Sequence, residues 1–214
     1  MFYRRMGINS GAQLSVQQLT DCSKNYLGVT KNNGCQGGWY LASYLYVKNI
    51  GLTTETYYRY NYNTIYYGAE QLCRTTNGPV YKISKPTYFN DNEYLTPNAA
   101  SCNSRKPYLR SGYAISVAMF ASDPAFYSYK SGVFTNCYNT NGQPISVNHA
   151  VIMVGFQAST VFLENFFILK NSWGVGWGEL GHFRVLDPPS NNAAYNKCYL
   201  CNYGYLSLPW LFNY

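Results

Sequence analysis

His149 and Asn171 are the two residues of this sequence best suited to proton-transfer chemistry. His149 opens an apolar run typical of a strand, and Asn171 directly follows a second apolar run, FFILK. An imidazole at the edge of one rigid strand can act as a base, while a neutral amide on the next strand holds its ring in one tautomer without adding charge. The glycines of residues 174–181 allow tight turns beside such a pair, and Trp173 and Trp177 can shield it from water.

Five motifs in order resemble the papain family of cysteine proteases. They are LSVQQLTDC (14–22), GCQGG (34–38), SGVFTNC (131–137), NHAVIMVGF (148–156) and KNSWGVGWGELGHF (170–183). The resemblance covers nearly the whole chain. It implies that His149 and Asn171 are catalytic, although a lone histidine in an apolar strand is more often a satisfied core residue than a catalyst. His182 stands where the family usually has tyrosine and is interpreted as structural.

The same resemblance implies where a peptide substrate binds. Gly38, after Gly37, would bond an extended peptide through its backbone, and Trp173 would cover the His149–Asn171 hydrogen bond. The main specificity pocket would be lined by Trp39, Tyr40, Ala118 and Ala150. The alternatives are that Gly37 and Gly38 only make a tight turn and that Trp39 and Tyr40 are core residues.

The family's nucleophile motif, C-G-[SA]-C-[WY], does not occur in these 214 residues. Cys22 has roughly the expected separation from His149, but it lacks the flanking residues of that motif, and the adjacent Asp21 would disfavour a thiolate. The expectation is therefore an N-terminally truncated chain that lacks the start of the central helix, the nucleophile and the oxyanion glutamine. Alone, it would be inactive.

Seven cysteines indicate an oxidising compartment. The resemblance pairs Cys22 with Cys73, and Cys137 with a cysteine near the C-terminus, for which Cys198 fits better than Cys201. It pairs Cys35 with a cysteine upstream of Met1. Cys102 and Cys201 have no assigned partner and could pair with each other.

Composition excludes several classes of protein. The chain is 47% hydrophobic and 12% charged, which is typical of a globular domain. Its net charge of +7 is spread over scattered pairs and accompanies no nucleic-acid motif. The sequence has no run of about 18 consecutive apolar residues, the length needed to span a membrane. Its histidines and cysteines lack the spacing of metal ligands. We expect a monomer without cofactor or metal that acts on peptides or proteins in a lysosome, in a digestive vacuole or outside the cell.

The predicted fold class is α+β, in one papain-like domain of two parts. Residues 1–84 favour helices: a capping box of Ser15 and Gln18 starts one, and a helical period follows Trp39. Residues 85–214 favour an antiparallel sheet, with alternating residues over 115–119 and short strands at 166–169 and 183–186. Residues 149–156 are nearly all apolar, which predicts a strand buried on both faces.

Two functions from different classes remain. The first is a cysteine peptidase working through a Cys-His-Asn mechanism. The second is a non-catalytic homologue that binds peptides or partner proteins in its cleft. The joint presence of His149, Asn171 and Trp173 favours the peptidase, because a pure binding protein needs no such combination.

Overall fold

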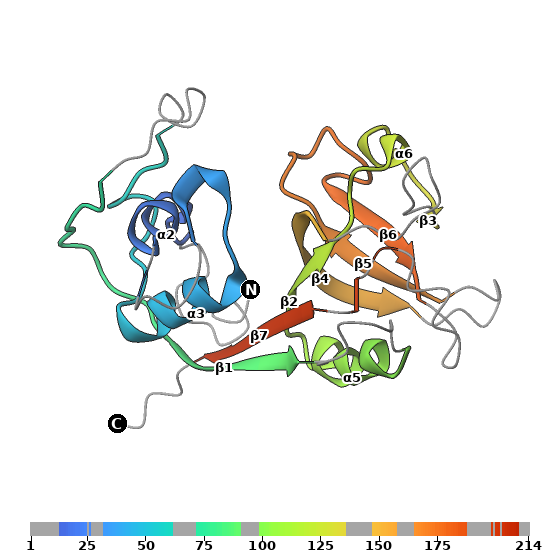
Figure 1. Ribbon diagram of the computed structural model, residues 1–214, viewed down its shortest axis with the longest axis horizontal. Helices are drawn as coiled ribbons and strands as arrows, with labels where there is room; N and C mark the ends of the chain where they lie inside the picture. The colour runs from blue at the N-terminus through green and yellow to red at the C-terminus, as the bar shows by residue number, and fades with distance from the viewer. Residues whose placement is uncertain are drawn as a thin grey trace. The chain divides into compact units, whose positions relative to one another are not determined.

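The computed structural model describes residues 13–24, 26, 32–61, 72–90, 99–135, 147–157, 165–187, 198, 200–201 and 203–209, with only the backbone described at 84–90, 99–102 and 203–209. The chain divides into two compact units (Figure 1). The first comprises Met1–Thr87 with Ser207–Tyr214, and the second comprises Tyr88–Leu206.

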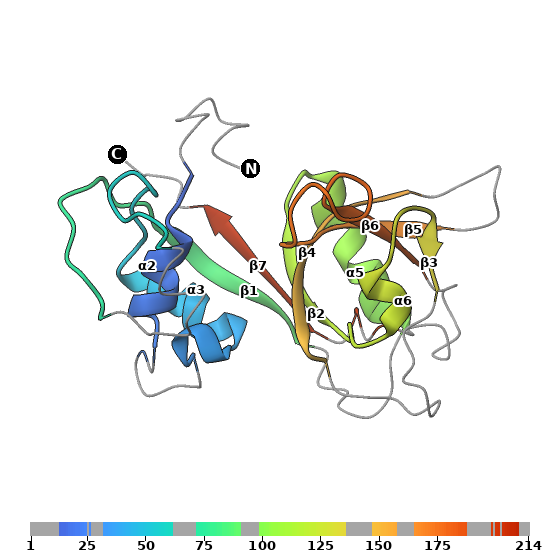
Figure 2. The ribbon, with the colours of Figure 1, turned by 90° about the horizontal axis from the view of Figure 1, so that it is seen from above.

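The first unit is built on helices α2 (Val16–Cys22) and α3 (Tyr40–Asn49), with the short 3-10 helix η2 (Gly34–Gln36) between them. α2 and α3 lie close together (Figure 2). Ser15 caps α2, and its Oγ accepts a bond from Gln18 N at 2.9 Å. The predicted capping box forms only in part: Gln18 Oε1 accepts from Thr53 N at 2.8 Å, while Ser15 N donates to Thr53 O at 2.9 Å. The helix start is thereby joined to the segment after α3.

A disulfide joins Cys22, at the end of α2, to Cys73, as the family resemblance implies. Beside it, Tyr58 is 1% exposed and donates from its hydroxyl to Asp21 Oδ2 at 2.8 Å. Arg74 lies over the Tyr58 ring, 4.3 Å from the centroid. Part of the tyrosine-rich segment after Glu55 is thus packed by an aromatic side chain.

The second unit is built mainly on strands of one seven-stranded sheet. The strands of this sheet have the order β1-β7-β2-β4-β5-β6-β3, and β1 and β7 each include residues of both units. Their bounds are β1 (Ile83–Asn90), β2 (Ile115–Met119), β3 (Val133–Phe134), β4 (His149–Gln157), β5 (Phe166–Lys170), β6 (His182–Leu186) and β7 (Tyr203–Pro209). The pairs β2–β4, β2–β7, β4–β5 and β5–β6 are antiparallel, and β3–β6 is parallel. Together with the helices this confirms the α+β class.

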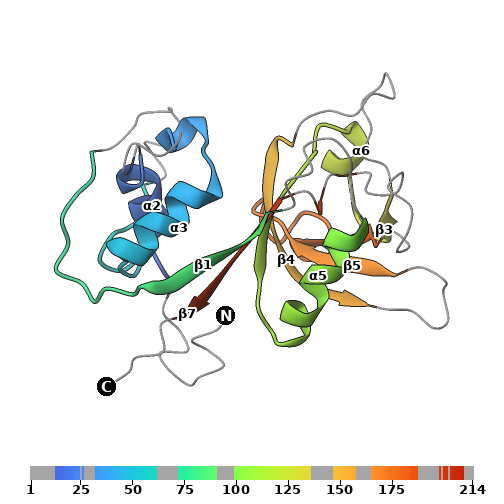
Figure 3. The ribbon, with the colours of Figure 1, turned by 60° about the horizontal axis from the view of Figure 1, so that its bottom comes forward.

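Two helices accompany the sheet, α5 (Ala99–Arg110) and α6 (Pro124–Tyr127). The sequence analysis favours a sheet over residues 85–214 and does not predict α5. Pro107 lies inside this helix, although proline disrupts a helix interior. α5 nevertheless packs beside β4, where Leu109 joins the core (Figure 3). Its Arg105 is fully buried, and Nη2 donates to Cys201 O at 2.8 Å. Tertiary packing outweighs local propensity here.

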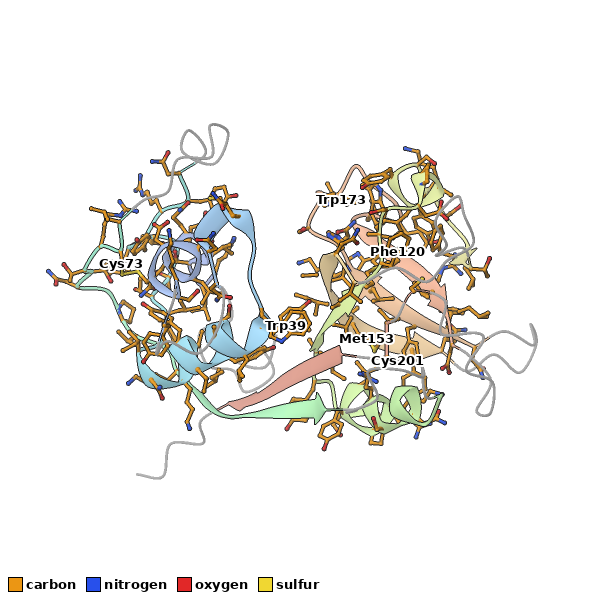
Figure 4. All side chains as sticks on the ribbon, viewed as in Figure 1. Trp39, Cys73, Phe120, Met153, Trp173 and Cys201 are labelled. Carbon is orange, nitrogen blue, oxygen red and sulfur yellow. A yellow bond between two sulfur atoms is a disulfide. The ribbon has the colours of Figure 1, made fainter. Side chains whose placement is uncertain are left out.

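The core of this unit contains Phe120 and Met153 (Figure 4). The predicted alternation in β2 is confirmed in that Ile115, Val117 and Met119 are all fully buried. The prediction that β4 is buried on both faces is wrong. Val151 and Met153 are buried, whereas Ala150 and Ile152 are exposed, as in an antiparallel strand that packs one face on the core.

Replacing both Cys22 and Cys73 with serine should lower the free energy of unfolding of the first unit. The disulfide closes a chain segment of 51 residues, and restricting the unfolded chain over that length is worth about 4 kcal/mol. Urea unfolding of the double variant should therefore show a lower midpoint. Cys35→Ser is the control, because Cys35 is a free, exposed thiol. Equal midpoints for the double variant and the control would contradict the structural role of the disulfide.

Candidate active site

His149 is the first residue of β4, and its neighbour Asn148 fixes it there. Asn148 N donates to Met119 O at 3.0 Å. Its side-chain Oδ1 accepts from Ala121 N at 2.9 Å, and Nδ2 donates to Ser122 Oγ. The chain just before His149 is therefore bonded to the segment after β2. This role of Asn148 could not be identified from the sequence, because the asparagine and its partners are far apart in the chain.

Asn171 lies beside His149, and His149 Nε2 is 2.9 Å from Asn171 Oδ1. The amide of Ser172 also donates to Asn171 Oδ1, at 2.8 Å. A backbone N–H can only donate, so this atom of Asn171 is the carbonyl oxygen. His149 must then carry its hydrogen on Nε2, which leaves Nδ1 as the basic nitrogen of the neutral ring.

The register of β4 and β5 places these two residues on one face of the sheet. Ile152 pairs with Lys170, so Asn171 is level with Val151 and diagonal to His149. Side chains in such positions share a face and can reach each other. Asn171 itself is 5% exposed and continues the buried side of β5.

A β-bulge sets this register. Met153 pairs with Leu169, but Gly155 pairs with Ile168, so Val154 is an extra residue in β4. Without this extra residue, the register of the pairs from Gly155–Ile168 onward would continue along both strands, and Asn171 would lie opposite Ile152. Ile152 points to the other face, because successive side chains alternate. The bulge therefore decides whether Asn171 and His149 can meet.

Aromatic rings pack around the imidazole. Trp173 lies 5.0 Å from the His149 ring, centroid to centroid, and stacks in parallel on Tyr127 of α6 at 5.5 Å. Fully buried Phe126 lies edge-on to both His149 and Trp173, at 6.2 and 5.4 Å. Trp177 Nε1 donates to Tyr127 O at 3.1 Å and so ties the ring cluster to α6. Trp173 keeps 38% of its surface exposed, and its role as a cover for the His149–Asn171 hydrogen bond stays a prediction.

Glu179 supports the same loop electrostatically. Its carboxylate accepts from Arg184 Nε at 3.1 and 3.0 Å and from Gly132 N at 3.0 Å. The bond from Arg184 is the main cause that lowers the pKa of Glu179 below its ordinary value of 4.5. The same pairing raises the pKa of Arg184.

In the first unit the structure places Gly37, Gly38, Trp39 and Tyr40 next to one another. Gly37 has φ +104°, and both glycines are exposed. A Cβ on Gly38 would lie 2.3 Å from Asn32 Oδ1, so only glycine fits here. Asn32 is the buried centre of this turn: Oδ1 accepts from Trp39 N at 2.8 Å, and Nδ2 donates to Ser23 and Ser43. Its role was not predicted, because only the turn chemistry of Asn32 is visible in the sequence.

The two alanines predicted to line the specificity pocket differ in exposure. Ala150 is exposed, whereas its cross-strand partner Ala118 is only 4% exposed. Cys198 and Cys201 are both disulfide-bonded, while the side chains of Cys137 and Cys102 lie outside the described part of the chain.

No helix in the described part of the chain is both long and apolar enough to cross a membrane. Within it, no cluster of three or more His, Cys, Asp or Glu could hold a metal ion.

An α+β fold with a strand-edge histidine, an asparagine that fixes its tautomer and a tryptophan above them defines the papain-like class. The family profile described as papain family cysteine protease matches residues 2–204. The chain belongs to this family.

Its relatives include plant and animal enzymes. Zingipain-2 of Zingiber officinale is 35% identical over 174 residues, which cover 80% of this chain and 66% of the relative. Digestive cysteine proteinase 1 of Homarus americanus is 32% identical over 191 residues, covering 87% and 52%. The chain thus spans between about half and two thirds of these relatives.

Solved structures agree in fold. The bromelain protease of Ananas comosus, in complex with the E64 inhibitor, has a TM-score of 0.72 at 27% identity and covers 98% of this chain and 83% of that one. Digestive procathepsin L2 of Tenebrio molitor has a TM-score of 0.71 at 28% identity, with coverage of 96% and 56%.

Gly38→Ala should destabilise the first unit. The new Cβ would displace Asn32, and a buried polar group that loses its partners costs about 1–3 kcal/mol. Chemical unfolding measures this loss. The matched control is Gly176→Ala, where a Cβ would meet no atom within 4 Å. If both variants unfold at the same denaturant concentration, Asn32 does not hold the turn.

Glu179→Gln should weaken the acid dependence of stability. Because the folded-state pKa of Glu179 is lowered, its contribution is fully present above the ordinary value of 4.5 and is lost as pH falls through the folded-state value. Urea unfolding between about pH 6 and about pH 3, roughly 1.5 units on either side of the ordinary glutamate value, should show a steeper decline for the wild type than for the variant. Parallel curves would contradict the prediction.

Proposed function

We propose that this chain carries the base and the orienting amide of a papain-like cysteine peptidase. His149 would be the base and acid, Asn171 would hold its ring, and Trp173 would keep water from their hydrogen bond. The observation that carries the proposal is the 2.9 Å contact of His149 Nε2 with Asn171 Oδ1, in which Ser172 fixes the oxygen as acceptor. It leaves His149 Nδ1 free to exchange a proton with a nucleophile.

The proposed reaction hydrolyses a peptide bond in two steps. A cysteine thiolate, paired with the His149 imidazolium, attacks the carbonyl carbon, while backbone and glutamine donors hold the oxyanion. The imidazolium then gives its proton to the leaving amine, and a thioester remains. His149 next takes a proton from water, whose oxygen attacks the thioester; the carboxylic acid product is released and the thiolate–imidazolium pair is restored.

The nucleophile of this mechanism is not among the described cysteines of the chain. Cys22 and Cys73 are bonded to each other, and Cys198 and Cys201 are also in disulfides. Cys35 is free and exposed, but it lies in the GCQGG turn and lacks the family's nucleophile motif. The proposal therefore includes a segment with that motif, C-G-[SA]-C-[WY], joined ahead of Met1. Residues 1–214 alone should not hydrolyse peptides.

The substrate would be a peptide or protein bound in extended form. Gly38 has an exposed backbone that could pair with such a peptide. Trp39 and Tyr40 are half-buried, with ring centroids 5.8 Å apart, and expose apolar surface. By the family resemblance, these two rings would line the main specificity pocket.

The protein would act as a monomer in an oxidising, acidic or extracellular compartment. Disulfides at Cys22, Cys73, Cys198 and Cys201 support an oxidising one, because cytosolic thiols are kept reduced. By the family resemblance, this compartment would be a lysosome, a digestive vacuole or the extracellular space. Neither cofactor nor nucleic acid enters the proposal.

The alternative is a non-catalytic homologue that binds peptides. The complete His149–Asn171–Trp173 arrangement favours catalysis over this alternative, because a pure binding protein needs no such combination. A chimaera separates the two. The N-terminal segment of the bromelain protease, through its nucleophile cysteine and the central helix up to the match with this chain, is joined ahead of the chain. The product is then treated with a thiol-directed epoxide and with a fluorogenic peptide.

A peptidase should be labelled irreversibly and should turn over the peptide, and His149→Ala should reduce turnover by about 10²–10⁴-fold, the usual contribution of a general acid–base. Replacing the nucleophile cysteine of the joined segment with alanine is the control for labelling at another thiol. A folded chimaera that binds peptides but is neither labelled nor active would establish the binding function instead.

A further inference from the structure

The segment 171–181 connects β5 to β6, and its two ends are bonded at the base. Lys170 pairs with His182 in the sheet, and the next residue, Asn171, donates from its backbone N to Gly181 O at 2.9 Å. Glu179 and His182 exchange backbone bonds, at 2.8 and 3.1 Å. The carbonyl of Gly181 therefore fixes the backbone of Asn171, from which the side chain reaches His149.

Leu180, just before that carbonyl, is in an unfavourable conformation. Its φ is +53°, and among the described residues no other non-glycine has positive φ. The Cβ of an ordinary residue crowds the backbone in this left-handed region. The side chain is 76% exposed, so packing does not hold it there. Such a conformation persists only where surrounding bonds impose it.

Two hydrogen bonds hold the peptide group that links Leu180 to Gly181. His182 Nδ1 lies 3.0 Å from Leu180 O, so the ring must carry a hydrogen on Nδ1 in order to donate. At the other end of the same peptide unit, Gly181 N donates to Trp177 O at 2.8 Å. His182 thus binds the carbonyl oxygen of Leu180, and the carbonyl of Trp177 binds the amide N–H of Gly181. The next carbonyl along the chain, that of Gly181, accepts the hydrogen bond from Asn171 N.

We propose that His182 is a positioning residue for the His149–Asn171 pair. Its Nδ1–H holds the left-handed turn at Leu180, the turn aims Gly181 O at Asn171 N, and Asn171 Oδ1 then holds His149 Nε2–H. His182 touches neither substrate nor nucleophile in this role. Its importance for catalysis rests on the proposed peptidase function, but the geometric claim concerns the chain itself and can be tested without activity.

The test follows the Nε2 proton of His149 by NMR in uniformly ¹⁵N-labelled residues 1–214. The chain has only two histidines, so variants of His182 leave one imidazole to assign. His182→Phe keeps a planar ring without the donor. His182→Asn keeps an amide N–H close to the position of Nδ1. Leu180→Gly removes the strain, because glycine adopts positive φ without penalty.

In the His182→Phe variant, the Nε2 proton of His149 should exchange with solvent about ten-fold faster than in the wild type. A ten-fold change is the effect of losing one hydrogen bond. His182→Asn should restore slow exchange. In the Leu180→Gly background, His182→Phe should have little further effect, because the turn no longer needs to be held. This non-additivity distinguishes positioning from general destabilisation.

Exchange within two-fold of the wild type in a folded His182→Phe variant (well below the ten-fold effect of one lost bond) would overturn the proposal. If His182→Phe does not fold, the double variant decides: a folded Leu180→Gly/His182→Phe protein with a slowly exchanging proton supports the proposal, and any other result overturns it. A chimaera that remains unlabelled by the epoxide would remove the peptidase function and leave this exchange result unaffected.

Discussion

The site depends on which face of a sheet two side chains occupy. His149 and Asn171 lie on neighbouring antiparallel strands, and one extra residue, Val154, puts them on the same face. Hydrogen bonds then complete what the register begins. Asn148 fixes the start of β4, Gly181 fixes the backbone of Asn171, and Ser172 fixes which atom of its amide accepts the proton of His149. The proposed chemistry needs the tautomer of His149 that carries its hydrogen on Nε2. Each of these contacts excludes one alternative arrangement of His149 and Asn171.

The same bonds explain why so few charges are needed at the site. Asn171 is neutral, and its carbonyl satisfies both an imidazole and a backbone amide in a nearly water-free position. A neutral acceptor orients a ring without the large desolvation cost of a buried carboxylate. The charged pair of Glu179 and Arg184 lies instead at the rim of the loop, with side chains 28% and 32% exposed. There it fixes the loop without placing a charge beside His149.

Sequence patterns predicted the elements well, and the family, the α+β class and the strand edges at His149 and Asn171 all follow from motifs read along the chain. What they could not show is contact between distant residues. Asn32 and Asn148 look like ordinary turn and strand-start residues until their partners are known. The bulge at Val154 has no signature among apolar residues. The run of β4 is nearly all apolar, which favours burial on both faces, yet Ala150 and Ile152 are exposed. Pro107 argues against a helix at α5, and the packing of α5 against β4 outweighs that preference.

The ring cluster makes the site optically distinct from the rest of the chain. Two of the four tryptophans, Trp173 and Trp177, lie in it, and Tyr127 stacks on one of them with its ring plane tilted by only 2°. Fixed neighbouring rings couple their electronic transitions, and freely rotating rings do not. Near-ultraviolet circular dichroism and tryptophan emission from this protein will therefore be weighted toward the surroundings of His149. A loosening of the loop that leaves the sheet intact will alter these signals before the far-ultraviolet spectrum changes.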